Sequence, residues 1–393
     1  MNSRTKLVAL EDVIARIRNG LSVKQSRDVD GLPISRIETI ADGTVDPMRV
    51  GYAGIKEGES DDWLLHRDDI LISHINSVDH LGKCAIYEGK PAKLIHGMNL
   101  LGLRVNRSLA DPRFFFYALR SPDFREQLPQ ITNQSVNQSS FSITNFRKLK
   151  VPLPPLSEQK RIAGILDQAD GLRRKRQQAL ALTDQFLRST FLDLFGDPIT
   201  NPKRWPMARL GSLGHWASGG TPPRSQMQYF QGDIDWYSAG ELNQRLLSPS
   251  KERISNDAIG VSGTKMFKAG TLLVGMYDTA AFKLGILPKA ASSNQACANL
   301  DLKHQSCDLN WLFSNLEIMR PYFLSHRRGV RQKNLTLQMI KDFEIPLPSS
   351  ELQRTYVTTM KTAESLKQRL LKSVSKQEAF FNGLVQRAFR GDL

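Results

Sequence analysis

The sequence is poor in the features that build disulfide frameworks and membrane spans. Its 393 residues include three cysteines, Cys84, Cys297 and Cys307, and no two of them form a CxxC pair. This usage predicts a reducing compartment and no disulfides. No apolar run approaches the roughly 20 residues that cross a bilayer, and the first residues lack the apolar core of a signal peptide. We therefore expect a cytoplasmic protein with no membrane partner.

The motifs of enzymes that act on DNA are missing as well. The sequence has no GxxxxGK[ST] phosphate loop, which argues against an ATPase. It has neither a glycine-rich cofactor turn after a predicted strand nor an NPPY or DPPF box, and a DNA methyltransferase would need both. His74, His80 and Cys84 do not have the spacing of a standard zinc site. The sequence thus predicts a chain that is not an enzyme and that binds no cofactor or metal.

One acidic set nevertheless leaves an alternative open. Asp69 precedes the apolar segment "CAIY", and Glu88 and Lys90 follow it. Such a set could hold Mg²⁺ and activate a water molecule in a nuclease. Against this, Gly89 and Pro91 place the lysine in a turn, and the second half of the chain has "GILPKAA" there, with no acid. A Mg²⁺-dependent nuclease is therefore the alternative, and it is weighed well below a non-catalytic function.

Positive charge is what the sequence has in excess. It contains 54 Lys and Arg against 39 Asp and Glu, a formal net charge of +15. A surplus of this size suits a polyanionic partner, of which nucleic acid is the commonest. Charge alone thus favours DNA or RNA binding.

The chain also contains a long internal repeat. One offset without gaps aligns the segment 152–154, Pro-Leu-Pro, with the segment 346–348, also Pro-Leu-Pro, 194 residues later. The same offset aligns further identical residues: Val136 with Val330, Gln138 with Gln332, Gln159 with Gln353, Ala169 with Ala363, Leu172 with Leu366, and Phe186 with Phe380. A period this long indicates a duplicated module, because solenoid repeats are 20–50 residues long.

Each copy of the repeat predicts a long helix after its proline segment. Prolines fix φ and remove backbone donors, so they lie before the helix, where Ser157 or Ser350 is placed as an N-cap. Apolar residues follow at three- and four-residue steps, several of them seven residues or a multiple apart, as in a coiled-coil seam. The predicted packing residues are Ile162, Leu166, Ala169, Leu180, Leu187, Tyr356, Met360, Ala363, Val374 and Phe381. If the seams pair, the connectivity makes the helices antiparallel.

The predicted fold class is α+β. Runs such as "DDILISHI" and "GTLLVGMY" predict strands, and "PRFFFYALRSPDF" predicts a helix. Two modules of mixed α/β structure, residues 1–150 and 199–345, are separated by two long antiparallel coiled-coil helices, residues 151–198 and 346–393. The duplication implies a pseudo-twofold axis.

Three polar loops are candidates for reading DNA. Base edges are read by Asn, Gln, Ser, Thr and Arg side chains, and phosphates are bound by Arg and Lys. The candidates are Asn133, Gln134, Asn137 and Gln138 in "TNQSVNQSS", Ser218, Thr221 and Arg224 in "ASGGTPPRSQ", and Arg327, Arg328, Arg331 and Lys333 in "RRGVRQKN". Both glutamine-bearing loops precede the repeated proline segment, so we expect them near the same face.

The order of these motifs resembles that of a known family. After the first module come "VPLPPLSEQKRIAGILDQAD", "FLDLFGDP" and "NPKRWPMARLGSLGHWASGGTPP", and the chain ends in "LVQRAFRGDL". Over essentially its whole length the sequence resembles the DNA-binding specificity subunit of type I restriction-modification systems. The second junction, "PLPSSELQ", lacks the PPL and EQ of the first.

The resemblance implies what the modules and helices do. Each module would be a target-recognition domain that reads one half of a split, asymmetric site in double-stranded DNA. The spacer helices would dock two methyltransferase (modification) subunits, which restriction endonuclease–translocase subunits then join. The altered second junction implies that one methyltransferase is held less tightly. A structural coiled-coil adaptor remains a further alternative, and it would lack sequence-selective binding.

Overall fold

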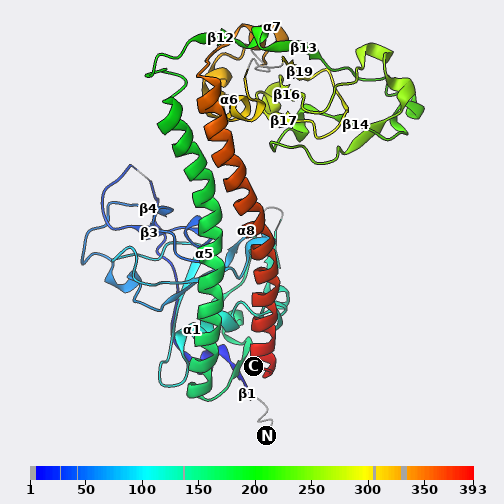
Figure 1. Ribbon diagram of the computed structural model, residues 1–393. Helices are drawn as coiled ribbons and strands as arrows, with labels where there is room; N and C mark the ends of the chain where they lie inside the picture. The colour runs from blue at the N-terminus through cyan, green and yellow to red at the C-terminus, as the bar shows by residue number, and fades with distance from the viewer. Residues whose placement is uncertain (1–5, 27, 42, 136–137, 304–306, 329–333) are drawn as a thin grey trace. The chain divides into compact units, whose positions relative to one another are not determined.

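The computed structural model describes residues 6–393 except 27, 42, 136–137, 304–306 and 329–333 (Figure 1). The chain divides into two compact units. Unit 1 consists of the residues up to Gln178 together with Lys372–Leu393, and unit 2 is Ala179–Leu371. The two longest helices, α5 (Leu156–Phe195) and α8 (Ser350–Arg390), each begin in one unit and end in the other. Each unit therefore contains part of both long helices.

Unit 1 is built on a four-stranded antiparallel sheet with the strand order β2-β8-β5-β7. Three small sheets, β1-β11, β6-β10-β9 and β3-β4, surround it. Its elements are β1 (Lys6–Ala9), β2 (Ile14–Asn19), β3 (Ile34–Ser35), β4 (Val50–Gly51), β5 (Ile70–Ser73), β6 (Ile75–Asn76), β7 (Cys84–Ile86), β8 (Leu100–Val105), α1 (Pro112–Ala118), α2 (Pro122–Arg125), α3 (Leu128–Ile131), β9 (Asn133–Gln134), β10 (Ser139–Ser140), α4 (Ile143–Arg147) and β11 (Lys150–Leu153).

One face of that sheet forms the core of unit 1 with α1 and the two long helices. Leu103 of β8, Phe114 of α1, Leu166 of α5 and Phe381 of α8 are buried in one apolar cluster. Burying an apolar side chain of this size stabilises the fold by roughly 1.5–3 kcal/mol. The end of the chain is therefore part of the same core as its first strands.

Unit 2 repeats this framework. Its four-stranded sheet has the order β13-β19-β16-β17, and the smaller sheets are β12-β20 and β15-β14-β18. Its elements are β12 (Met207–Arg209), β13 (Gly214–Ser218), β14 (Ile234–Tyr237), β15 (Glu252–Ile254), β16 (Leu272–Gly275), β17 (Leu284–Ile286), β18 (Ser292–Ser293), β19 (Cys297–Leu302), α6 (Leu309–Ser325), α7 (Leu337–Asp342) and β20 (Glu344–Pro346). The duplication predicted from the sequence is confirmed by the strand order of the two four-stranded sheets, whereas the smaller sheets differ.

Each unit contains a buried glutamine that makes the same set of hydrogen bonds. The Gln159 side-chain oxygen accepts a hydrogen bond from the backbone N–H of Asp111 (2.8 Å), and Gln353 accepts one from Asp308 (2.7 Å). Each glutamine amide also donates to a carbonyl of its proline segment at 2.8 Å. Asp111 and Asp308 are the N-caps of α1 and α6. One side chain thus ties the start of each long helix to the first helix of its module.

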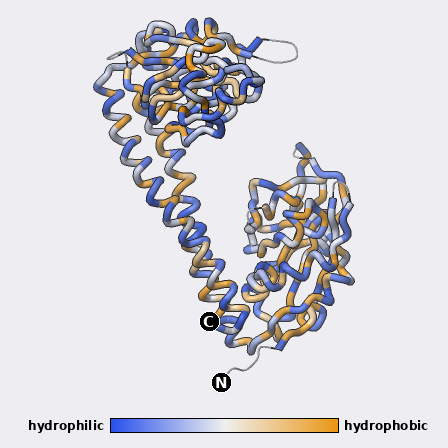
Figure 2. Tube along the Cα trace, turned by 90° about the vertical axis from the view of Figure 1, so that its right-hand side faces the viewer, coloured by the Kyte–Doolittle hydropathy of each residue, from blue (hydrophilic) through white to orange (hydrophobic). Residues whose placement is uncertain are grey.

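Within each unit the parts of α5 and α8 lie side by side (Figures 1 and 2). In unit 1, Arg173 is 3.6 Å from Glu378 and Arg176 is hydrogen-bonded to Ser373. The partner's number falls as the α5 number rises, so the helices are antiparallel, as predicted. Figure 2 shows hydrophilic and hydrophobic residues alternating along both helices.

The boundaries of the compact units fall inside the long helices. The division of the chain into four segments at residues 150, 198 and 345 stays a prediction. Among the described residues, no helix is long and apolar enough to cross a membrane.

Candidate nucleic-acid interface

Each unit carries a hairpin at an equivalent position after its central sheet. In unit 1 the Phe141 N–H donates to the carbonyl of His74 (3.1 Å), and in unit 2 the Leu335 N–H donates to that of Met276 (2.8 Å). Phe141 and Leu335 are related by the repeat offset, so the segments that precede them correspond. These segments are the two glutamine-bearing loops predicted to read DNA.

The unit 1 hairpin presents amide side chains to solvent. β9, which contains Asn133 and Gln134, pairs with β10, and both residues are exposed. The turn is closed by the Ser135 hydroxyl, which donates to the Gln138 carbonyl at 2.6 Å. Asn137 lies outside the described residues. Exposed amide side chains on a strand suit bidentate contacts to base edges.

The unit 2 hairpin is basic where that of unit 1 is neutral. Arg328 and Asn334 exchange backbone hydrogen bonds of 3.0 and 2.9 Å, which close the loop, and the Arg328 side chain is exposed. Arg327 is half-buried and donates to the Leu324 carbonyl at 3.1 Å. The other two predicted residues, Arg331 and Lys333, lie outside the described residues.

The third predicted loop is tied down by its own contacts. Ser218 ends β13 and is half-buried, and the Thr221 hydroxyl is hydrogen-bonded to Gln295. The Arg224 guanidinium forms two hydrogen bonds with Glu252, of 2.5 and 2.9 Å, and these bonds lower the pKa of that carboxyl.

Arg224 also stacks over the rings of Phe230 (4.4 Å) and Trp236 (5.2 Å). Its charge is therefore compensated and its plane is covered, which suits a residue that organises this loop. Its predicted contact with DNA stays a prediction.

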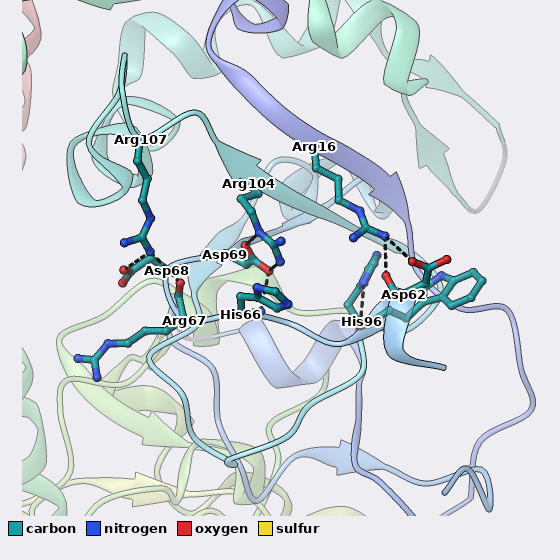
Figure 3. A network of polar contacts seen from close by, with 10 residues as sticks. Arg16, Asp62, His66, Arg67, Asp68, Asp69, His96, Arg104 and Arg107 are labelled. Carbon is teal, nitrogen blue, oxygen red and sulfur yellow. Dashed lines mark hydrogen bonds and ion pairs between the residues drawn. The ribbon is translucent and has the colours of Figure 1, made fainter. Parts of the chain in front are cut away.

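A further polar cluster lies on β2 and β8 of the unit 1 sheet (Figure 3), on the face that also carries Leu71 and Leu100 of a second apolar cluster. Arg16 and Arg18 flank the core residue Ile17 on β2, and Arg104 lies on β8 directly opposite Arg16. These arginines are absent from the residues predicted by loop composition. The alternation "IARIR" is the signal in the sequence, because it places two arginines on one face of a strand.

The three arginines have partners of different kinds. Arg104 donates to both carboxylate oxygens of the buried Asp69, each at 2.7 Å. Arg16 and Arg18 donate instead to one backbone carbonyl, that of Asp62, at 2.7 and 3.0 Å. The Asp62 carboxylate is farther away, at 3.5 and 3.7 Å, and its side chain is 74% exposed.

Two further residues complete this surface. Arg18 stacks on the Trp63 ring at 3.8 Å. His96 is buried, which lowers its pKa, so the ring is neutral near pH 7. Gly102 allows its close approach, because a Cβ there would lie 3.1–3.2 Å from the ring of His96. The three arginines, Asp62, Asp69 and His96 line a hollow of about 20 Å³.

The acidic set behind the nuclease alternative is held in separate ion pairs. Asp69 is engaged by Arg104, and Glu88 is 2.8 Å from Arg113. In the part of the chain that the structure describes, no group of three or more His, Cys, Asp or Glu side chains could hold a metal ion.

The predicted packing residues of the helices occupy several environments. Ile162, Leu166 and Phe381 lie in the core of unit 1, with Ala169 packed against it. Tyr356 and Met360 lie in the core of unit 2, with Leu187 against it. Ala363 is buried, whereas Leu180 and Val374 are half-buried and belong to neither cluster.

Comparison with known proteins identifies the family. The family model described as "Type I restriction modification DNA specificity domain" matches residues 2–182 and 202–377. The putative type I restriction enzyme MjaX specificity subunit of Methanocaldococcus jannaschii is 32% identical, over 91% of this chain and 86% of that one. The EcoBI specificity subunit of Escherichia coli is 23% identical, over 97% and 85%.

Solved structures share the fold. The S subunit of a type I restriction-modification system from M. genitalium superimposes with a TM-score of 0.58, covering 99% of this chain and 97% of that one at 12% identity. A second chain, from work on complex assembly and conformational transition of the type I system, gives 0.58 at 18% identity, with coverage of 99% and 98%. With its two matched domains and its duplicated framework, the chain belongs to the type I restriction-modification DNA specificity family.

Proposed function

We propose that the chain reads a bipartite, asymmetric sequence in double-stranded DNA as the non-catalytic specificity subunit of a type I restriction-modification complex. One observation carries this proposal. The two units share the strand order of their four-stranded sheets and the hydrogen bonds of Gln159 and Gln353, but their equivalent hairpins have different side chains, Asn133 and Gln134 in one and Arg328 in the other. A shared framework whose hairpins carry different side chains suits two domains that read different half-sites. Reading DNA places the chain where DNA is kept, which we infer to be the cytoplasm.

Methylome mapping of cells with and without the gene tests this function. The split sequence should lose methylation when the gene is removed. Substitution of Asn133 and Gln134 by Ala should relax one half-site, because each bidentate pair with a base contributes about 1–3 kcal/mol of discrimination. Arg328→Gln is the matched variant and should affect the other half-site only. Methylation that is unchanged in both variants would remove the hairpins from the reading surface.

Partner docking is supported by apolar residues that the repeat places on the exposed sides of both helices. Leu172 and Leu366 are 54% and 49% exposed, and Phe186 and Phe380 are 51% and 63% exposed. Of these four residues, Leu172 and Phe380 belong to unit 1, and Phe186 and Leu366 belong to unit 2. Exposed large apolar side chains at repeated positions favour protein contacts.

The Leu and the Phe of each unit lie at one level of the helix pair. In unit 1, Arg173 follows Leu172 and stacks on Phe381, the neighbour of Phe380, at 5.6 Å. In unit 2, Lys367 follows Leu366 and lies 2.5 Å from Asp184, two residues before Phe186. We infer that these patches dock two copies of one partner, the methyltransferase, and that restriction endonuclease–translocase subunits join this core.

The mass of the purified complex tests the docking. Leu172→Ser with Phe380→Ser should remove one methyltransferase subunit, and Leu366→Ser with Phe186→Ser should remove the other. Leu182→Ser is the control, since this leucine is 53% exposed but has Lys376 at its repeat position. Complexes of unchanged mass in both double variants would overturn the assignment.

Two simple assays separate the alternatives. A nuclease built on Asp69, Glu88 and Lys90 requires the purified chain to cut DNA with Mg²⁺ alone. A structural adaptor requires equal binding to target and unrelated duplexes.

A further inference from the structure

The arginines on the unit 1 sheet form an arrangement that folding alone disfavours. Arg16 and Arg104 are directly cross-strand, and like charges in that position destabilise a sheet. Arg18, two residues along the same strand, adds a third cation to the same face. An arrangement that costs stability suggests a ligand that offsets the repulsion.

The partners of these arginines leave the charge only partly compensated. Three guanidinium groups face two carboxylates, and only Asp69 makes close contacts. Arg16 and Arg18 are fixed by the carbonyl of Asp62, which orients them without neutralising them. Among the described contacts, the hydrogen bonds of Arg16 use its Nη2 and those of Arg18 use its Nη1. Further N–H groups of both forks remain available for an oxyanion.

We propose that Arg16, Arg18 and Arg104 form a phosphate-binding site on unit 1. The hollow of about 20 Å³ that they line has room for a group the size of a water molecule, such as one non-bridging phosphate oxygen. Stacking on Trp63 keeps the Arg18 plane fixed, so little side-chain entropy is lost on binding. The ligand is a phosphate group, either in the DNA backbone or in a small phosphorylated molecule.

Unit 2 has different residues at the equivalent positions. In register with Arg16, Arg18 and Arg104 stand His215, Ala217 and Asp301. Asp301 forms an ion pair of 2.8 Å with Lys268, so an acid replaces the cross-strand arginine. The phosphate site is therefore a feature of unit 1. If its ligand is a phosphate of the DNA backbone, the site adds a contact that unit 2 lacks, and this version of the proposal rests on the proposed reading of DNA.

Salt titration of DNA binding by the assembled complex tests the site. We expect Arg16→Gln with Arg18→Gln to weaken target and unrelated duplexes by the same factor. The slope of log affinity against log salt should flatten by about 0.9 for each phosphate that the variant no longer binds. The control, Arg107→Gln with Arg161→Gln, removes the same charge from arginines already paired with Asp68 (2.9 Å) and Glu158 (2.6 Å). It should leave the slope of log affinity against log salt unchanged, because neither arginine is proposed to bind a phosphate.

A second arm distinguishes the source of the phosphate. The full chain without DNA is titrated with inorganic phosphate, and with sodium chloride at equal ionic strength, while its thermal midpoint is followed. A phosphate-specific rise that is absent from the double variant, together with an unchanged DNA slope, would assign the site to a small phosphorylated ligand. A flattened DNA slope assigns it to the DNA backbone. If the double variant matches the wild type in both arms, the site is disproved.

If the chain does not read DNA sequence at all, the binding assays give a result that differs from the loss of the phosphate site. In that case the wild type would bind target and unrelated duplexes equally, and the comparison of slopes would still test the arginines.

Discussion

A buried histidine of unit 1 occupies the position that a methionine holds in unit 2. His74 is 7% exposed, and burial lowers its pKa to about 4. The unfolded chain binds a proton at this residue below its ordinary pKa of about 6.5, whereas the folded chain does not. The contribution that the neutral His74 makes to the free energy of unfolding is therefore fully present above pH 6.5 and is lost as the pH falls toward 4. Between pH 7.5 and pH 5 we expect a loss of about 2 kcal/mol.

Denaturant unfolding at the two pH values measures this loss. His74→Met copies the residue of unit 2, Met276, and should remove the His74 share of the pH dependence, while the share of His96, whose pKa burial also lowers, remains. The matched control is His215→Met, which makes the same replacement at an exposed histidine. A wild-type profile in the first variant would show that burial of His74 is not its cause.

At this scale the sequence predicts repeated residues better than residues that meet through strand pairing. Gln159 and Gln353 are visible as identities at the repeat offset, although the bonds they make are not. Arg16 and Arg104 are 88 positions apart, and only the register of β2 and β8 makes them neighbours. Register depends on how the whole sheet packs, so loop composition could not identify this pair.

At the scale of an element, the long helices show what a periodic apolar pattern can and cannot predict. Segments 151–198 and 346–393 predict helices, and α5 and α8 lie within them. The spacing indicates an apolar face without saying what covers it. The structure covers Leu166 with the core of unit 1, while Leu180 lies outside both unit cores.

This difference gives a matched pair of helix variants. Leu166→Asp puts a charge into a fully buried site and should cost more than about 4 kcal/mol of stability. Leu180→Asp, on a half-buried site of the same helix, should cost below about 1 kcal/mol. Urea unfolding of each single variant checks this, and equal losses would contradict the environments described.

Short strands were harder to predict than helices. "DDILISHI" contains β5, whose four residues are all buried, because a buried apolar run is readable in isolation. The two-residue strands β9 and β10 are polar, and they form a sheet in which β10 lies between β9 and β6. Their sequence therefore predicts a loop.

At the scale of the whole molecule, the net charge of +15 should dominate the salt dependence of DNA binding. If roughly six to ten phosphates are contacted, affinity should fall by about 10³–10⁵ between 50 and 200 mM salt. A mismatched half-site should lower affinity without changing that slope, because base contacts release few counterions. A nearly flat dependence of the assembled complex would contradict this expectation.

The chain passes between the units only within α5 and within α8. Four residues inserted into both helices at these points add about 6 Å by helical rise. We expect the unspecified spacer between half-sites to lengthen by about one or two base pairs, with both half-sites unchanged. Methylome mapping of the variant reads this directly, and the original spacer would show that the helices do not set it.

The last 22 residues of the chain, Lys372–Leu393, belong to unit 1, and Phe381 and Phe389 lie in its core. During translation, unit 2 has its whole sequence before the ribosome reaches these residues, whereas unit 1 waits with part of its apolar surface open. The first module to be made is thus the last to be finished. A message that breaks off within α8 but after Leu371 yields a protein with an intact second unit and an exposed first core, which is the kind of surface that chaperones and proteases recognise.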